Sequence, residues 1–348
     1  MPDKLTLESL SGHGHAKAVL KAALVGDRVA HAYLFHGEPG IGKFTTAMIF
    51  ASTAICEERE QCGVVSCEAC GRCAACRTVA AGNHPDIAVL RPEGATIKID
   101  RIRELQSAIT FKPFSAPRKW CIVDDAETMT LEAANCFLKT LEEPPPHSTL
   151  ILVTARPQAL PATIRSRCQA VRFTIPPREE TIRRLQSERG LSAGQAAQLT
   201  GLTLGRPGAA MEADLSSLLA ERERLFEILS PERLREPETI FEAPEALAPN
   251  AEALRHTLNA IEIYLRDLLI GQHCSDDSLL LHQDIKEMIH RRGSEISPRK
   301  LLEAVTLIQT FKRGSTRNLN PALVIETVLL FLRDAMAEAG TLETRSAP

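Results

Sequence analysis

Residues 32–43 read AYLFHGEPGIGK, an apolar run that leads directly into a glycine-rich loop. The apolar run predicts a buried strand and the loop opens a helical stretch, which is the setting that a phosphate-binding loop needs. Glycines allow backbone N–H groups to close around phosphates, and a lysine at the helix start meets the outer phosphates as a point charge. The candidate nucleotide-binding residues are Gly37, Gly40, Gly42 and Lys43.

The residue after Lys43 departs from a complete nucleotide site. Phe44 stands where a serine or threonine hydroxyl should bind magnesium. Thr45 carries the next hydroxyl and is a further candidate, but it comes one position late and points about 100 degrees away around the helix. This departure argues against ATP hydrolysis, and a glycine turn that binds no nucleotide is the alternative.

Two acidic residues follow a second apolar run, at 121–123. Asp124 fits the magnesium-coordinating acid of a nucleotide site, and Asp125 stands where an active ATPase carries a glutamate that polarises the attacking water. Aspartate is one methylene shorter, which draws the base back from that water. The pattern predicts a degenerate catalytic pair, and two acids that only cap a strand end are the alternative.

Six of the ten cysteines lie within a short stretch after the phosphate loop. In a reducing compartment, such clustering favours a metal over disulfides. The spacing Cys70-x-x-Cys73-x-x-Cys76 brings three thiolates together, and tetrahedral structural zinc needs one more donor. Unligated thiols are the alternative, although exposed ones would oxidise readily. The spacing leaves three candidates for the fourth ligand: Cys56, Cys62 and Cys67.

The rest of the chain predicts an α/β fold that continues into helices. Its 348 residues suffice for two or three packed units. Hydrophobic residues make up 44% but aromatic residues only 4%, so aliphatic side chains must form the core, as in parallel sheets covered by helices. Further strands are expected at 87–90 and 150–153. The fold class is a P-loop parallel sheet with helices and an inserted zinc module at about 56–77.

Three domains are expected from the change in pattern along the chain. The sheet domain spans 1–175, because strand signals vanish after the prolines at 176 and 177. Short helical segments at 176–213 predict a small helical lid. The remainder, 214–348, predicts an all-helical domain, in which 301–311 and 323–336 carry wide apolar faces suited to packing.

Three local features are predicted from capping and turn chemistry. Asp100 and Thr130 are expected to cap the N-termini of two helices, because each precedes an apolar pattern with helical spacing. The stretch 231–249 is rich in proline and glutamate and is expected to form an irregular connection.

Charge and hydropathy restrict the partners and the compartment. The net charge of −3 provides no strong field for nucleic acid, so any DNA contact must be local. Residues 1–11 lack a charged and apolar leader, and no run approaches the roughly 20 apolar residues that cross a bilayer. These observations predict a cytoplasmic protein.

A pair of arginines follows the polar turn at 160–164. Arg165 and Arg167 flank a serine, and one of them could reach a nucleotide bound by a neighbouring subunit. The planar guanidinium suits this role because it stabilises phosphate charge in the transition state. From spacing alone, a surface salt bridge is the favoured reading.

Several motifs together resemble bacterial DNA polymerase III clamp-loader subunits of the AAA+ family. The resemblance covers residues 5–210, and the combination is more specific than any single motif. A weaker likeness to the collar of these subunits lies at 318–321 (NLNP). The motifs, besides the phosphate loop and the cysteines, are HAYLF at 31–35, GNHPD at 82–86, NCFLKTLEEP at 135–144 and SRC at 166–168.

The resemblance implies a pentameric machine whose motor subunits bind ATP, open a sliding clamp and place it on primed DNA. It implies that Arg167 acts in trans as an arginine finger on an adjacent gamma or tau motor subunit, with a delta subunit as a further partner. It also selects Cys56 as the fourth zinc ligand, beside Cys70, Cys73 and Cys76. The zinc implied is structural.

The departures from the family pattern favour its non-motor branch, a rigid stator. Besides Phe44 and Asp125, Gly208 falls where the motors carry a sensor arginine. Thr154, at the first sensor position, is compatible with either branch. The alternatives are an active gamma or tau type ATPase and, less favoured, a zinc-dependent nucleic-acid binder, because the cysteine segment holds mainly Arg72 and Arg77 as basic residues.

Overall fold

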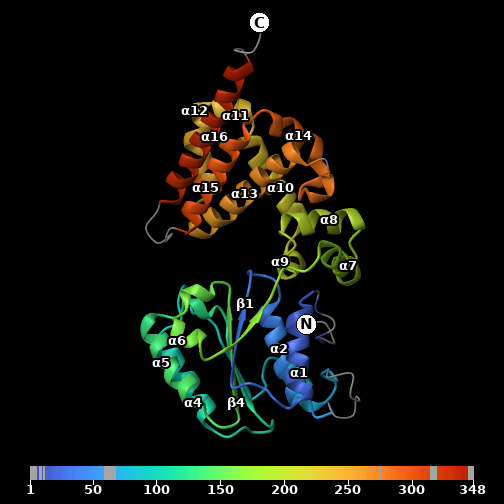
Figure 1. The fold of residues 1–348 in the computed structure, drawn as a ribbon, viewed down its shortest axis with the longest axis vertical. Helices are drawn as coiled ribbons and strands as arrows, with labels where there is room; N and C mark the ends of the chain where they lie inside the picture. The colour runs from blue at the N-terminus through green and yellow to red at the C-terminus, as the bar shows by residue number, and fades with distance from the viewer. Residues whose placement is uncertain are drawn as a thin grey trace. The chain divides into compact units, whose positions relative to one another are not determined.

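The computed structural model describes residues 6, 7, 10, 12–58, 68–274, 276–313 and 320–343 (Figure 1). The chain divides into two compact units. The sheet unit comprises Met1–Gly190 with Gly205–Met211, and the helical unit comprises Leu191–Leu204 with Glu212–Pro348. Each unit is described by itself below.

The sheet unit contains a five-stranded parallel sheet in the order β2-β3-β4-β1-β5. The strands expected from the sequence are confirmed, and β5 is a strand that the sequence pattern did not reveal. Of the four residues of β5 only Val171 is buried, so the strand lacks an apolar run. The strands are β1 (Ala32–His36), β2 (Ile87–Leu90), β3 (Lys119–Val123), β4 (Ser148–Thr154) and β5 (Gln169–Arg172).

Helices cover both faces of the sheet (Figure 1). Because side chains alternate along a strand, Tyr33 and Phe35 face one core while Leu34 faces the other. Helices α1 (Gly14–Val25) and α2 (Lys43–Ile55) cover the first face. The second face is covered by α4 (Ile99–Thr110), α5 (Leu131–Glu142) and α6 (Ala162–Arg165). The remaining helices that begin in this unit are α3 (Ala74–Ala80), α7 (Arg178–Arg189) and α9 (Pro207–Glu212).

One of the two predicted helix caps is confirmed. The Thr130 hydroxyl accepts the N–H of Ala133 at 3.2 Å and caps α5. The prediction for Asp100 is wrong, because α4 begins two residues earlier than expected, at Ile99, and Lys98 occupies the cap position. Asp100 lies in the first turn instead, where a carboxylate is stabilised by the positive end of the helix dipole.

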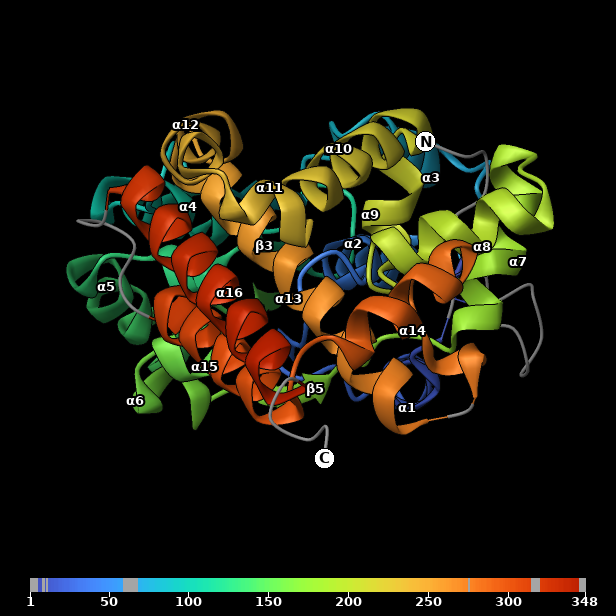
Figure 2. The ribbon, with the colours of Figure 1, turned by 90° about the horizontal axis from the view of Figure 1, so that it is seen from above.

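The helical unit packs around α13 (Ala251–His273), with α14 on one side and α15 and α16 on the other (Figure 2). Leu258, Ile261 and Leu265 of α13 are fully buried in its core. The apolar stretches expected at 301–311 and 323–336 lie within α15 and α16, and Asn318 and Leu319 lie outside the described residues. The other helices are α8 (Ala193–Leu202), α10 (Leu215–Ile228), α11 (Pro231–Arg235), α12 (Pro237–Leu247), α14 (Lys286–Ser294), α15 (Pro298–Arg313) and α16 (Pro321–Glu343).

The irregular connection predicted at 231–249 is wrong, because α11 and α12 occupy most of it. Pro231 and Pro237 stand at the first position of each helix, where no N–H is needed and the fixed φ of proline suits the helix. Leu234 and Ile240 are buried in the core of the helical unit. Tertiary packing therefore makes helices of a stretch whose composition is typical of a linker.

Membrane insertion by a helix finds no support in the described part of the chain, where no helix combines the necessary length with sufficient hydropathy.

Candidate functional site: a phosphate loop and a cysteine cluster on one helix

The glycine loop between β1 and α2 has the backbone that the sequence predicts. Gly37, Gly40 and Gly42 have φ values of 148, 71 and 94 degrees, which side-chain-bearing residues rarely adopt. A Cβ on Gly37 would also lie 2.4 Å from the carbonyl oxygen of Phe173, next to β5. The fold itself therefore demands glycine at this position, independently of any ligand.

Lys43 is turned back onto the loop. Its side chain is buried, and Nζ donates to the carbonyl oxygens of Gly37 at 2.8 Å and Glu38 at 2.6 Å. Burial lowers the pKa of Lys43, while the carboxylates of Glu127, Asp124 and Asp125 oppose this shift. The ammonium group is thus satisfied by the protein's own carbonyls.

A guanidinium lies at the side of the loop where the sequence places the magnesium ligands. The guanidinium carbon of Arg91 is 4.3 Å from the ring centroid of Phe44, and its Nε is 3.5 Å from Oδ2 of Asp124. Burial and the neighbouring Asp125 raise the pKa of Asp124, whereas Arg91 lowers it. With a phenyl ring in place of the hydroxyl and a cation beside the acid, these residues do not fit a magnesium ion.

The other predicted site residues surround the loop. Asp125 follows β3 in the left-handed region and is exposed, and Thr45 lies half-buried in the first turn of α2. Thr154 ends β4 beside His36 of β1 and is fully buried. Its hydroxyl accepts the N–H of Arg156 at 3.0 Å.

Sequence reasoning missed two charged residues at this site, Arg91 and Glu127. The Glu127 side chain is only 5% exposed, accepts the N–H of Ala155 at 3.1 Å, and is the largest charge influence on Lys43. Neither residue belongs to a phosphate-loop motif. The strand register could have found Arg91, because β2 pairs with β3 and brings the ends of both strands together.

The segment carrying Gly208 lies against the loop. The N–H of Gly208 donates to the Gly40 carbonyl oxygen at 2.9 Å, and a Cβ on Gly208 would approach that oxygen to 2.8 Å. Nη2 of Arg206 lies 3.6 Å from a carboxylate oxygen of Glu38. The position expected to lack a sensor arginine is therefore in direct backbone contact with the phosphate loop.

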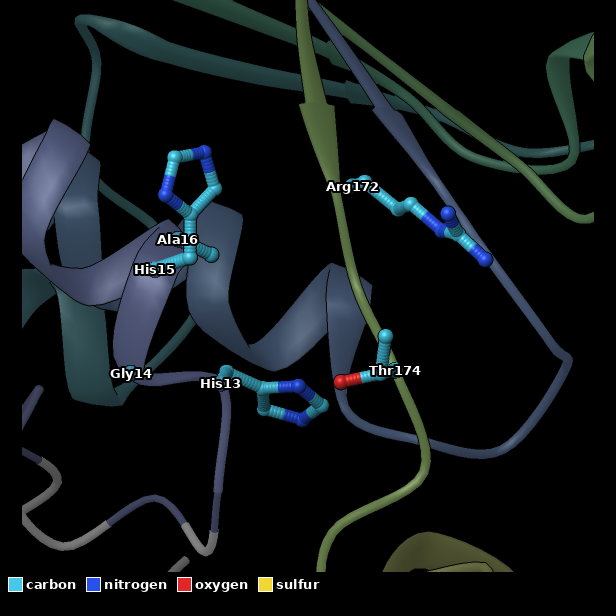
Figure 3. Close-up of a pocket in the computed structure, with 6 residues that line it drawn as sticks. All are labelled: His13, Gly14, His15, Ala16, Arg172 and Thr174. Atoms are coloured by element: carbon cyan, nitrogen blue, oxygen red, sulfur yellow. The ribbon is translucent and has the colours of Figure 1, made fainter.

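A small cavity opens beside the loop, with a volume of about 170 Å³ (Figure 3). Figure 3 shows His13 next to Thr174, with Arg172 and His15 further along the lining. The Nε2 of His13 donates to the carbonyl oxygen of Ile41 at 2.7 Å, and burial lowers the pKa of His13, which favours this neutral form. This hydrogen bond links His13 in the cavity lining to Ile41 of the phosphate loop.

Four cysteines meet at the far end of α2. Cys56 ends this helix and Cys73 caps α3, and the sulfur atoms of the four residues lie within 4.8 Å of one another. Several backbone N–H groups point at these sulfurs, as in Cys70 N–H to Cys56 Sγ at 3.3 Å. Four thiolates are the donor set of structural zinc sites, so these residues fit a metal ion. The cluster consists of Cys56, Cys70, Cys73 and Cys76.

The thiols of this cluster differ in acidity. Burial opposes ionisation of Cys70, but the N–H groups of Arg72 and Cys73 and the neighbouring thiols outweigh it and lower its pKa to about 7. Burial raises the pKa of Cys56 and of Cys76. Cys62 and Cys67, the other candidates for the fourth ligand, lie outside the described residues.

Arg167 lies two residues beyond the end of α6, between that helix and β5. Its Nη2 is 2.8 Å from a carboxylate oxygen of Glu142, and its Nη1 donates to the carbonyl oxygen of Thr163 at 3.1 Å. The side chain is 37% exposed. The salt bridge expected from spacing is present, and the guanidinium remains accessible at the surface.

Comparisons with known proteins identify relatives of this chain. A family model described as DNA polymerase III, delta subunit, matches residues 12–177. The chain is 30% identical to "DNA polymerase III subunit delta'" of Pseudomonas aeruginosa over 86% of this chain and 91% of the relative. It is 29% identical to the protein of that name from Bacillus subtilis, over 88% of this chain and 92% of the relative.

A further relative and one solved structure match different fractions of this chain. "DNA polymerase III subunit tau" of Bacillus subtilis is 36% identical over 48% of this chain and 28% of its own length. A gamma subunit-related protein from Thermotoga maritima is 20% identical, with a TM-score of 0.43, over 92% of this chain and 99% of that one.

The five-stranded parallel sheet and the glycine loop between β1 and α2 define a P-loop nucleotide fold. Within that class, the chain belongs to the delta prime subunits of DNA polymerase III.

Proposed function

We propose that this chain is the stator subunit of a clamp loader, which helps to load a sliding clamp on primed DNA without hydrolysing ATP itself. The observation that carries the proposal is the pairing of Phe44 and Asp124 with Arg91 in a chain of the delta prime family. A site without a hydroxyl ligand for magnesium cannot support the metal-assisted chemistry of phosphoryl transfer. Gamma or tau and delta subunits are the proposed partners.

Arg167 is proposed to serve a neighbouring motor subunit. Its exposure and its placement after α6 support this role, since the side chain can leave Glu142 for a stronger phosphate partner. The bond from its Nη1 to the carbonyl oxygen of Thr163 restricts the guanidinium before a neighbour binds. Pre-orientation of this kind lowers the entropic cost of forming the trans contact.

The test is ATP turnover with and without partners. The isolated chain should show none, and the reconstituted loader with Arg167→Ala should lose about 3 kcal/mol or more of barrier lowering at the site served, about a hundredfold in rate. Arg165→Ala is the matched control, because Arg165 is exposed and ends α6 two residues before Arg167. Unchanged turnover in the Arg167 variant would refute the role.

The four-cysteine cluster is proposed to bind structural zinc. All four donors come from the protein, which leaves no open coordination position for a substrate. Its support is the mutual approach of the sulfurs and the cap that Cys73 provides for α3. Elemental analysis of Cys56→Ser beside Cys62→Ser would test which thiol is the fourth donor.

The second candidate is an active motor ATPase of the gamma or tau type. The observation that favours it is the intact glycine loop with Lys43. Hydrolysis by the isolated chain that is abolished by Lys43→Ala would decide for this candidate and against the stator.

A further inference from the structure

Arg91 enters the nucleotide site because of the strand register. It directly follows Leu90, the last residue of β2, and the N–H of Asp124 donates to the Leu90 carbonyl oxygen at 2.9 Å. This bond fixes the ends of β2 and β3 beside each other. The side chain of Arg91 therefore starts next to the acid that a complete site would use to hold a metal.

The ring of Phe44 packs against the guanidinium of Arg91. A cation 4.3 Å from a ring centroid lies well within the roughly 6 Å over which the ring attracts it. A serine or threonine hydroxyl at position 44 would offer no such surface. Phe44 therefore lacks the hydroxyl that would bind magnesium, and its ring contacts the Arg91 guanidinium instead.

The carboxylates at the end of β3 also require a positive charge nearby. Asp124, Asp125 and Glu127 follow one another closely at the end of β3, and two of these side chains are largely shielded from water. Buried carboxylates need a compensating charge, which a metal ion supplies in complete sites. Arginine keeps its charge at all relevant pH values, so it supplies this compensation permanently.

We infer that Arg91 takes the place of the magnesium ion in this site, held by the Phe44 ring and the Asp124 carboxylate. The inference deepens the proposed function, because it explains why a phosphate loop persists without metal chemistry. It predicts that magnesium brings no gain in nucleotide affinity to the wild-type chain. Sixty per cent of the Arg91 side chain is exposed, so its replacement should leave the fold intact.

The experiment measures the binding of a fluorescent ATP analogue with magnesium and with EDTA. The proteins are the wild type, Phe44→Ser, Arg91→Met and the double variant. In the double variant, magnesium should tighten binding about tenfold or more, within the range of measured couplings between contacting residues, and each single variant should gain far less. Arg233→Met is the matched control, since Arg233 is an exposed arginine paired with Glu236 in the helical unit.

Three outcomes would overturn the inference: magnesium dependence in the wild type, none in the double variant, or as much in Phe44→Ser alone as in the double variant. A second measurement needs no nucleotide. Carboxyl NMR of Arg91→Met should show a raised pKa for Asp124, because Arg91 lowers it in the wild type. An unchanged value would equally contradict the inference. Failure of the Arg167 test would remove the stator role and leave these results standing.

Discussion

The two ends of α2 carry sites of different completeness. At its start, Lys43 is bound to the loop's own carbonyls and Arg91 lies beside Asp124, whereas at its end Cys56 joins three further thiols in a ready donor set. Gly37 is required because a Cβ there would meet the Phe173 carbonyl oxygen, whereas the four thiols meet where Cys56 ends α2 and Cys73 caps α3. The glycine loop thus meets a packing requirement at one end of α2, while the thiols at the other end fit a metal ion.

The strongest test of this difference is Cys73→Ser. The variant should lose the bound metal and on the order of 4 kcal/mol of stability, as is typical when a structural metal site is destroyed. Metal content by elemental analysis and denaturant unfolding would measure both. A variant that unfolds at the same denaturant concentration as the wild type would show that the cluster is not a structural site.

The acidity of Cys70 offers a second test, in metal-free protein. Its pKa lies below the usual range for a thiol, so the reactive thiolate is present above a pH of about 7 and is lost as the pH falls through that value. Alkylation followed by peptide mapping should modify Cys70 before Cys56 and Cys76, whose pKa values are raised. Added zinc should protect all four cysteines. Equal alkylation rates at neutral pH would contradict the prediction.

Gly208→Ala tests how closely α9 packs against the phosphate loop. Alanine normally stabilises a helix relative to glycine, but here its Cβ would meet the Gly40 carbonyl oxygen at 2.8 Å. We expect a loss of roughly 1–3 kcal/mol, as for overpacked sites. Gly194→Ala in α8 is the control, because no atom lies within 4 Å of its Cβ, and it should gain about 0.4–1 kcal/mol. Thermal unfolding that ranks the two variants the other way would disprove the close fit.

Lys43→Met should have the smallest effect. The variant loses two charge-assisted hydrogen bonds to Gly37 and Glu38 and a cation near the site's carboxylates, but Arg91 and Arg156 remain beside those carboxylates. It also removes the cost of burying an ammonium group. These contributions offset each other to within about 1 kcal/mol. A loss as large as that of Cys73→Ser in denaturant unfolding would mean that both ends of α2 are equally essential to the fold.

Much of the sheet unit was predictable because its signals are local. Four strands are short apolar runs, and the glycine loop and the cysteine spacing are contiguous in the sequence. β5 was missed because an edge strand with three exposed residues has no apolar run. The stretch 231–249 was misread because composition does not show that Leu234 and Ile240 enter a core.

The sequence alone determined the residue types of the site: a glycine loop that keeps its lysine and loses its hydroxyl, and three closely spaced cysteines. The tertiary structure decided which cations and donors reach them. Arg91 follows Phe44 by 47 residues in the sequence. The two side chains meet only because parallel strands place their ends side by side. Cys56 likewise meets Cys70 because the end of α2 lies beside the segment that leads into α3, and no spacing rule fixes such a convergence.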